Sequence, residues 1–208
     1  MTDELYIAGT RTFAAEVADL AADAGFAVRG LLEPYDRTRT GPIHDLPVTW
    51  LEDAAPGLVV VGTGERDRRA IVERLTAAGF EFATLVHPRA QVSRTTSIGL
   101  GSVVSPGVVV GARTAIGSQV VLGRGALIGH HTEIGDFSTI NPGANVAGNV
   151  VVGEDAFIGL GAVVRDHLAV GAAALVAAGA VVVEDVEPGA QVRELPARVH
   201  DPDRDRVL

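Results

Sequence analysis

Residues 122–151 have the sequence LGRGAL-IGHHTE-IGDFST-INPGAN-VAGNVV, in which each hexapeptide begins with Leu, Ile or Val. The same period extends in both directions, so that every sixth residue from Val86 to Val182 is aliphatic. Four residues after each aliphatic position lies Ala, Ser, Thr or Val, with Leu168 as the one exception. Neither a helix nor a strand has a six-residue period. Repeats of this length indicate a parallel β-helix, whose units bury their apolar residues only by stacking on their neighbours.

The period also predicts the geometry of the coil. Three hexapeptides close a triangle of eighteen residues, so residues eighteen apart lie above one another at a spacing of about 4.8 Å. We expect the aliphatic residue to point inward and the small residue to fill the corner. Gly follows the aliphatic residue in nine units and would relieve the turn, through positive φ or close backbone approach. A β-sandwich is disfavoured, because its strands alternate with period two between irregular loops.

The first 85 residues have a different pattern. Apolar runs predict strands at residues 5–8, 28–32, 58–61 and 82–86, with helices at 12–24 and 65–78. Alternating strands and helices favour a small parallel α/β unit of Rossmann-like type, with its ligand crevice at the carboxyl ends of the strands. The polar segment 34–43 would form a loop over that crevice. We therefore predict an α/β domain at residues 1–85 and a β-helix domain at residues 86–208.

Composition restricts the possible partners and locations. The chain has no Cys, which excludes disulfides, thiol nucleophiles and thiolate metal sites. A net charge of −9 argues against nonspecific nucleic-acid binding. The longest apolar stretch, residues 171–183, is too short to span a bilayer, and no basic leader with a long apolar run is present at the N-terminus. We expect a cytoplasmic protein with neither nucleic-acid nor membrane partners.

Three segments point to a family. They are Leu85-Val86-His87-Pro88, residues 128–136 (IGHHTEIGD), and Ile140-Asn141-Pro142-Gly143 with Ala147-Gly148-Asn149-Val150. Together with the α/β domain and the closing residues 195–198 (LPAR), they resemble the NeuD/PglD-type sugar acyltransferases over nearly the whole chain. The resemblance implies a left-handed parallel β-helix and a homotrimer with CoA between adjacent coils. It also implies an enzyme that acetylates an amino or hydroxyl group of a nucleotide-linked sugar, with acetyl-CoA as donor.

The same resemblance assigns the catalytic positions. His130 matches the general base, and a neutral imidazole can accept a proton from the attacking group and later return one to the CoA thiolate. As the third residue of its hexapeptide, His130 should point outward. Gly148, eighteen residues further, would donate its N–H to the thioester carbonyl, although a purely structural role in the turn remains open. The cofactor-binding positions implied are Thr139, Gly159, Gly161, Ala162, Ala178 and Gly179.

Two residues depart from the family pattern. The residue after the base is usually Asp or Glu, but here it is His131, and a cation at this position would lower the pKa of His130. Asp136 or a carboxylate from another subunit could orient the ring instead. A second His of the family is replaced by Thr139, whose hydroxyl cannot carry a positive charge.

The resemblance implies five acceptor-binding positions in the front domain: Gly9, Arg11, Glu33, Gly64 and Arg69. Gly9 is the single glycine in a turn that the family makes glycine-rich, and Arg11 could supply charge to a diphosphate. Glu33 lies where the family places an acid that recognises uracil. For Arg11 and Arg69, a solvated helix face is an equally good interpretation.

Two other functions are known for proteins with this type of coil or compatible with it. Trimeric carbonic anhydrases share the coil, and His131 lies two coils from His167, but Ala172-Ala173-Ala174 occupies the place of the third His ligand, so no metal is expected. The alternative from another class is a non-catalytic scaffold or nucleotide-sensing module. Binding of CoA would distinguish the enzyme from the scaffold.

Overall fold

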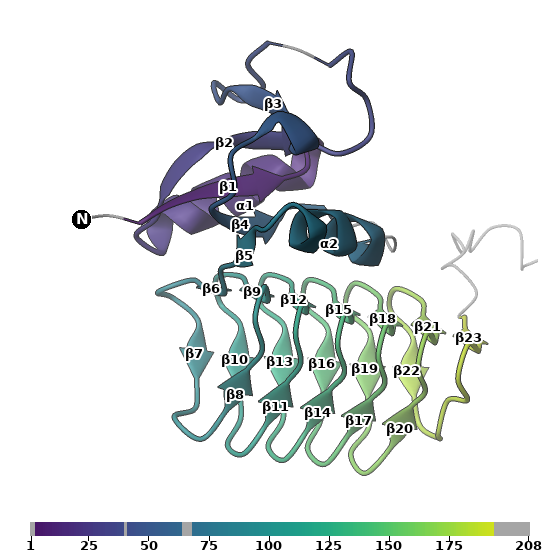
Figure 1. The fold of residues 1–208 in the computed structure, drawn as a ribbon. Coiled ribbons are helices and arrows are strands. Elements are labelled where there is room, and N and C mark those ends of the chain that lie inside the picture. Colours follow the sequence, from purple (N-terminus) through teal and green to yellow (C-terminus); the bar gives the residue numbers. More distant parts are fainter. Residues whose placement is uncertain (1–2, 40, 64–67, 194–208) are drawn as a thin grey trace, which may run out of the picture.

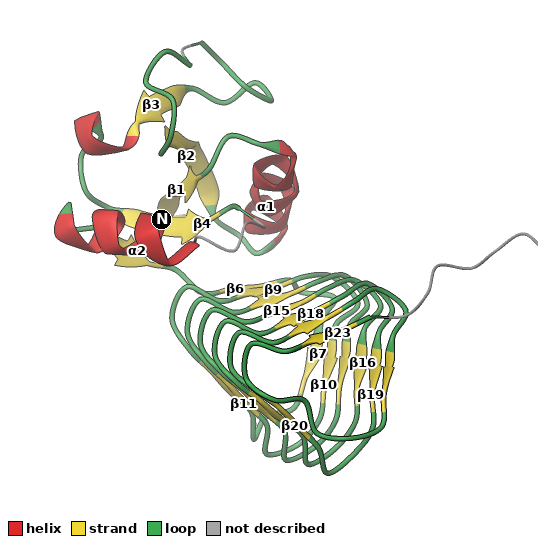
Figure 2. Cartoon of the chain, turned by 90° about the vertical axis from the view of Figure 1, so that its right-hand side faces the viewer, coloured by secondary structure: helices red, strands yellow, loops and turns green. Residues whose placement is uncertain are grey.

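The computed structural model describes residues 3–39, 41–63 and 68–193. A small α/β unit lies over one long face of a parallel β-solenoid (Figure 1). Figure 2 shows the solenoid end-on as a triangle, with the α/β unit beside one of its three sides. This arrangement decides which edges of the triangle are free to receive ligands or another chain.

The α/β unit contains a five-stranded sheet in the order β3-β2-β1-β4-β5, and every neighbouring pair is parallel. Its strands are β1 (Glu4–Ala8), β2 (Ala27–Glu33), β3 (Val48–Trp50), β4 (Leu58–Val61) and β5 (Glu81–Phe82). The strand expected at residues 82–86 is divided, because β6 (Leu85–Val86) pairs with the solenoid instead of the sheet. β3 was not predicted; its three residues are too few to give a periodic pattern.

Two helices pack on this sheet. α1 (Thr12–Asp23) and α2 (Arg68–Ala77) are followed by Gly25 and Gly79, whose φ values of 91° and 83° allow the chain to turn. A short 3-10 helix, η1 (Leu51–Asp53), follows β3. The predicted first turn of the second helix, residues 65–67, lies outside the described residues. Within the described ranges, no helix is long and apolar enough to cross a membrane.

The solenoid is built from three parallel sheets, here called sheets I, II and III. Sheet I faces the α/β unit and contains β6, β9 (Val103–Val104), β12 (Val121–Leu122), β15 (Thr139–Ile140), β18 (Phe157–Ile158), β21 (Leu175–Val176) and β23 (Gln191–Val192). Sheet II contains β7 (Gln91–Val92), β10 (Val109–Val110), β13 (Leu127–Ile128), β16 (Asn145–Val146), β19 (Val163–Val164) and β22 (Val181–Val182). Sheet III contains β8 (Ser97–Ile98), β11 (Ala115–Ile116), β14 (Glu133–Ile134), β17 (Val151–Val152) and β20 (Ala169–Val170).

The strand register confirms the eighteen-residue coil. Val110 pairs with Ile128, and Ile128 pairs with Val146. The last coil is two residues shorter, because Val176 pairs with Val192, and this shortening was not predicted. The aliphatic positions form one buried core, as expected, from Val104 onward. Val86, the first of the series, is 36% exposed, because no further coil covers it.

Glycines after the aliphatic residues serve close approach rather than positive φ. A Cβ on Gly99, for example, would lie 2.5 Å from the carbonyl carbon of Gly117 in the next coil. Positive φ occurs two residues later in the hexapeptide, at non-glycine residues such as Arg113 and Gln119 as well as at glycines such as Gly101. Of the two roles proposed for these glycines, only close approach is confirmed.

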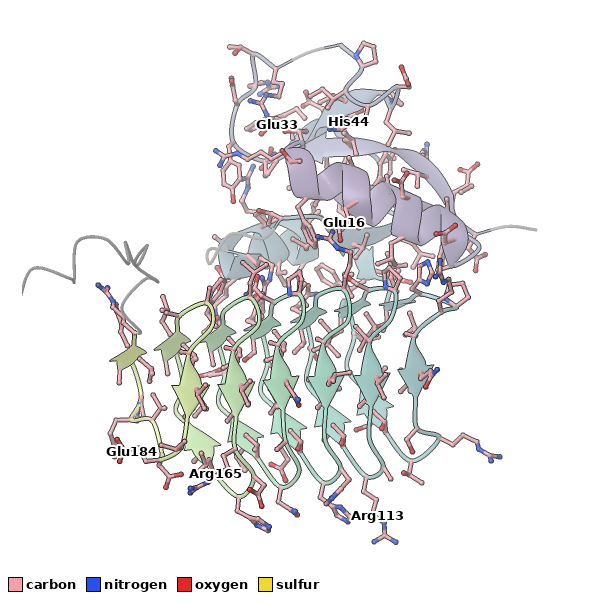
Figure 3. The ribbon with its side chains drawn as sticks, turned by 180° about the vertical axis from the view of Figure 1, so that it is seen from behind. Glu16, Glu33, His44, Arg113, Arg165 and Glu184 are labelled. Atoms are coloured by element: carbon pink, nitrogen blue, oxygen red, sulfur yellow. The ribbon has the colours of Figure 1, made fainter. Side chains whose placement is uncertain are left out.

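The α/β unit and the solenoid share part of their packing. Leu85 and Val103 of sheet I are fully buried in the core of the α/β unit, while the adjacent Val104 faces the solenoid core. Glu16, which lies on the side of α1 nearest the solenoid (Figure 3), forms an ion pair with Arg124. The alternation of side chains along sheet I thus joins two cores through one short strand.

Candidate active site

The predicted base lies on the edge between sheets II and III, here called the II/III edge. Arg113 marks this edge in Figure 3, at the side of the solenoid away from the α/β unit. His131 lies eighteen residues further, in the next coil, and its backbone N–H donates to the carbonyl of Ala112 at 2.9 Å. His130 and His131 are both exposed. The outward orientation expected for His130 is therefore present.

A left-handed backbone residue forms the corner of this edge in four successive coils. The φ values are 58° at Arg113, 55° at His131, 56° at Asn149 and 58° at His167. Few non-glycine residues adopt this conformation, and Asn and His are enriched among those that do. The corner fixes the direction of His131 and of the residue that precedes it.

The ring of His130 lies against the backbone of Gly148 in the following coil. A Cβ placed on Gly148 would be 2.9 Å from Cε1 of His130 and 3.0 Å from Nε2. The His130 carbonyl accepts the N–H of Asn149 at 2.9 Å, which holds the two turns together. Within the described residues, the Gly148 N–H donates to no backbone carbonyl. The site therefore combines an imidazole with a free backbone donor, and only glycine leaves room for the ring.

His130 also contacts His131, which occupies the position where the resemblance predicts Asp or Glu. Its Nδ1 lies 3.0 Å from Nδ1 of His131, within hydrogen-bond distance. The two rings are nearly perpendicular, with centroids 5.1 Å apart and an interplanar angle of 87°. Asp136, the acid suggested by the sequence as an alternative partner of the His130 ring, accepts the Ser118 N–H at 2.7 Å instead.

Five of the cofactor-binding candidates gather on another edge. They follow β18 and β21, at the I/II edge between sheets I and II, and they are Gly159, Gly161, Ala162, Ala178 and Gly179. Gly161 and Gly179 are exposed with φ values of 62° and 73°, whereas Ala162 is fully buried and can offer only its backbone. Sheet II separates this edge from His130.

The sixth candidate, Thr139, lies on sheet I beneath the α/β unit. Its hydroxyl accepts a hydrogen bond of 2.8 Å from Arg68 of α2. Arg68 is 3% exposed, and its guanidinium also donates to the carbonyls of Phe137 at 2.5 Å and Ser138 at 3.2 Å. Burial lowers the pKa of Arg68 to about 10. Sequence reasoning missed this residue, because nothing in a polar helix segment distinguishes a buried Arg from a solvated one.

A pocket opens at the carboxyl ends of β1, β2 and β4, as the α/β pattern predicts. Its lining residues are Gly9, Thr10, Arg11, Glu33, Tyr35, Asp36, Arg39, Gly62 and Thr63. Gly9 has a φ of 132°, and a Cβ there would lie 2.9 Å from the carbonyl oxygen of Gly62. The single glycine of this turn is thus required by its backbone. Three of the lining residues come from the loop predicted to cover the crevice.

The Glu33 carboxylate is engaged within the pocket. It accepts the backbone N–H groups of Tyr35 at 2.7 Å and Asp36 at 3.1 Å, and also the hydroxyl of Thr10. Arg39 approaches its other side, with Nη1 3.7 Å from Oε2. Glu33 is 2% exposed. A ligand in the pocket would therefore contact the residues that surround the carboxylate rather than the carboxylate itself.

The last two acceptor-binding candidates belong to the segment before and within α2. Arg69 forms an ion pair of 2.6 Å with Asp155 of the solenoid and lies over the ring of Phe137, 4.1 Å from its centroid. Its guanidinium therefore faces the solenoid rather than the pocket at Gly9. Gly64 lies outside the described residues.

The histidines of the II/III edge do not form a metal cluster. Across residues 3–39, 41–63 and 68–193, no group of three or more His, Cys, Asp or Glu side chains could hold a metal ion.

Comparison with known proteins gives a consistent set of similarities. Residues 131–166 match the family model of the bacterial transferase hexapeptide (six repeats). A search of curated protein sequences found no significant match. Among solved structures, the acetyltransferase domain of PglB from Neisseria gonorrhoeae is 33% identical with a TM-score of 0.86, over 95% of this chain and 99% of that one.

Two further structures are similar over the full length. PerB from Caulobacter crescentus, solved in complex with CoA and GDP-perosamine, is 27% identical with a TM-score of 0.86, over 97% of this chain and 99% of that one. WeeI from Acinetobacter baumannii is 25% identical with a TM-score of 0.83, over 95% and 99% of the two chains. The PglB domain has also been solved in complex with acetyl coenzyme A.

Proposed function

The chain belongs to the hexapeptide-repeat family of sugar acetyltransferases, and on this basis we propose that it transfers the acetyl group of acetyl-CoA to a nucleotide-linked sugar. The acceptor group is an amine or a hydroxyl, and the Caulobacter relative, a perosamine N-acetyltransferase, favours an amine. The observation that carries the proposal is the position of the His130 ring against Gly148, whose N–H has no backbone acceptor among the described residues.

His130 acts as the general base in this proposal. Its Nε2 removes a proton from the attacking amine while the nitrogen bonds to the thioester carbon. The carbonyl oxygen gains negative charge, which the Gly148 N–H stabilises by a hydrogen bond. When the C–S bond breaks, the protonated His130 returns its proton to the CoA thiolate. Each step uses a group that the II/III edge presents to solvent.

The α/β unit, proposed as residues 1–85, binds the nucleotide of the acceptor. Its parallel strand order supports the description as Rossmann-like, and the pocket at Gly9 lies beside the N-terminus of α1. A helix N-terminus favours a phosphate group, and Arg11 and Arg39 add positive charge to the pocket. Residues 86–208 are proposed as the acyltransferase domain. Its described part, residues 86–193, is a β-helix for which we propose the left-handed sense of this family.

A second copy of the chain completes the site. The pocket of the α/β unit lies on the sheet I side of the solenoid, whereas the II/III edge with His130 lies on the opposite side (Figures 2 and 3). The outward face of sheet II exposes a ladder of apolar side chains, Val109, Leu127, Val163 and Val181. Exposed apolar ladders of this kind mark contact surfaces. We propose a homotrimer in which CoA lies between adjacent solenoids and one chain's acceptor pocket faces another chain's His130.

Binding of the donor is tested first. Thermal unfolding is measured with and without acetyl-CoA, where an excess of about 100 times the dissociation constant adds about 2.7 kcal/mol to the free energy of unfolding. A shift of several degrees supports the donor site, and UDP-, GDP- and dTDP-linked amino sugars are then screened by release of the CoA thiol. The absence of a shift with acetyl-CoA and with longer acyl-CoAs would contradict the proposal and favour the scaffold.

A further inference from the structure

The hydrogen bond between His130 and His131 has only two possible arrangements. Their Nδ1 atoms are 3.0 Å apart, and a bond between two imidazole nitrogens requires that one ring donates the proton and the other accepts it. If His131 donates, neutral His130 carries its own proton on Nε2, next to Gly148, and has no lone pair there. If His130 donates, its Nε2 is free to accept a proton. Only the second arrangement gives a base.

We propose that His131 is a positioning residue, which accepts the Nδ1 proton of His130 and thereby keeps Nε2 of His130 free. This inference rests on the proposed role of His130 as the base. When His130 takes a proton from the acceptor amine, both of its nitrogens carry protons and the Nδ1–H···Nδ1 bond becomes charge-assisted and stronger. When the proton passes to the thiolate, the pair returns to its starting arrangement.

A neutral acceptor gives this pair a different pH response from a histidine–carboxylate pair. A carboxylate at position 131 would stabilise the imidazolium and raise the pKa of His130, whereas a neutral imidazole lacks that charge. The titratable side chains on this edge within two coils of His131 are Arg94, Arg113, Arg165, Asp166 and His167. Glu133 follows His131 on β14. Asp166 is paired with His167, at 3.7 Å. His131 therefore supplies an acceptor for the Nδ1 proton of His130 without the negative charge that a carboxylate would bring.

The corner geometry supplies variants that should fold. Asn149, Ala173 and Asp155 occupy the same corner position of other hexapeptides, each with a φ of 56°. Asn, Ala and Asp at position 131 therefore adopt a backbone conformation that this solenoid already contains. The Oδ1 atom of Asn or Asp lies at the same distance along the side chain as Nδ1 of His, and either oxygen can accept the His130 proton. Ala offers no acceptor.

The experiment measures kcat and KM of the full chain with acetyl-CoA and its amino-sugar acceptor, from about pH 5 to 9, across the range in which imidazole titrates. His131→Ala is expected to lower kcat about 10- to 100-fold at nearly unchanged KM, because the reactive tautomer and ring orientation are lost. His131→Asn should recover most of this loss. His131→Asp should move the acidic limb of the pH profile upward by about one unit or more.

One control variant and one spectroscopic measurement separate this positioning role of His131 from a structural role. His167→Ala alters the same corner two coils away, and wild-type kinetics are expected. Independently of activity, 15N NMR of the histidine side chains should show His130 protonated on Nδ1 at neutral pH and His131 protonated on Nε2.

Several outcomes would overturn the inference. They are wild-type kcat in His131→Ala, equal losses in the Ala and Asn variants, an unmoved acidic limb in His131→Asp, or an Nε2-protonated His130 in the spectrum. If His130→Ala itself retained activity, the proposed base would be lost as well. Wild-type kcat in His131→Ala alongside an inactive His130→Ala would remove only the role of His131.

Discussion

The His130 ring packs against Gly148, which lies one coil further along. A Cβ at position 148 would lie 2.9 Å from Cε1 of His130. The eighteen-residue coil brings these two residues together, because the turn after β13 stacks on the turn after β16. A base and a backbone donor are thereby placed side by side without any contribution from a loop.

Gly148→Ala should displace the His130 ring while leaving the fold unchanged. Gly148 does not have a positive φ, so Ala is compatible with its backbone, and only the imidazole has to move. We expect kcat/KM to fall about 10- to 100-fold, since misplacement of a catalytic group by about 1 Å is costly. Steady-state thiol release measures the effect. Gly57→Ala, where a Cβ meets nothing within 4 Å, is the matched control. Unchanged kcat/KM in Gly148→Ala would show that the contact between the His130 ring and Gly148 is not needed for catalysis.

Gly135→Ala should destabilise the solenoid itself. A Cβ at this position would lie 2.5 Å from the backbone nitrogen of Glu154 in the next coil, and backbone cannot move aside as a side chain can. Overpacking of this kind costs about 1–3 kcal/mol. Denaturant unfolding compares Gly135→Ala with wild type. Equal midpoints and slopes would show that the coils are not as tightly stacked as described.

Arg68 and Arg69 are adjacent in the sequence but should differ in their effect on stability. Arg68→Ala leaves the half-buried Phe137 carbonyl without the guanidinium donor and removes the buried hydrogen bond to the Thr139 hydroxyl, and we expect a loss of about 2–4 kcal/mol. Arg69→Ala removes a largely exposed ion pair with Asp155, with an expected loss below about 1 kcal/mol. Urea unfolding of both variants measures the difference. Equal losses would contradict the assignment of Arg68 as the buried contact between α2 and sheet I.

The solenoid and its inward positions could be predicted from the period alone, because a strict six-residue repeat leaves the aliphatic side chains no other way to become buried. The position of His130 on the surface followed from the same register. The contact of His130 with His131 could not be predicted, since it depends on the left-handed corner at residue 131. The burial of Arg68 could not be predicted from the sequence either, because it depends on how α2 packs on sheet I. The shortened last coil could not be predicted from the sequence, because the six-residue repeat ends at Val182, where this coil begins.

Mixed oligomers test whether two chains build each site. Arg11→Ala/Arg39→Ala is expected to weaken acceptor binding, and His130→Ala to remove the base, so each variant alone should be nearly inactive. In a random 1:1 mixture, a site between neighbouring chains combines an intact pocket with an intact His130 in about one quarter of cases. Co-expressed chains should therefore recover about a quarter of wild-type activity. No recovery in a confirmed mixed oligomer would place the pocket and the base of one site in the same chain.

The most direct test of the account is the turnover of His130→Ala with acetyl-CoA and the amino-sugar acceptor. Removal of a general base lowers the rate about 10²- to 10⁴-fold, so we expect kcat to fall at least about 100-fold. The stabilisation by acetyl-CoA in thermal unfolding should persist, because the donor positions proposed at the I/II edge do not include His130. Appreciable kcat in this variant, with the fold and the acetyl-CoA shift intact, would contradict the role of His130 as the base.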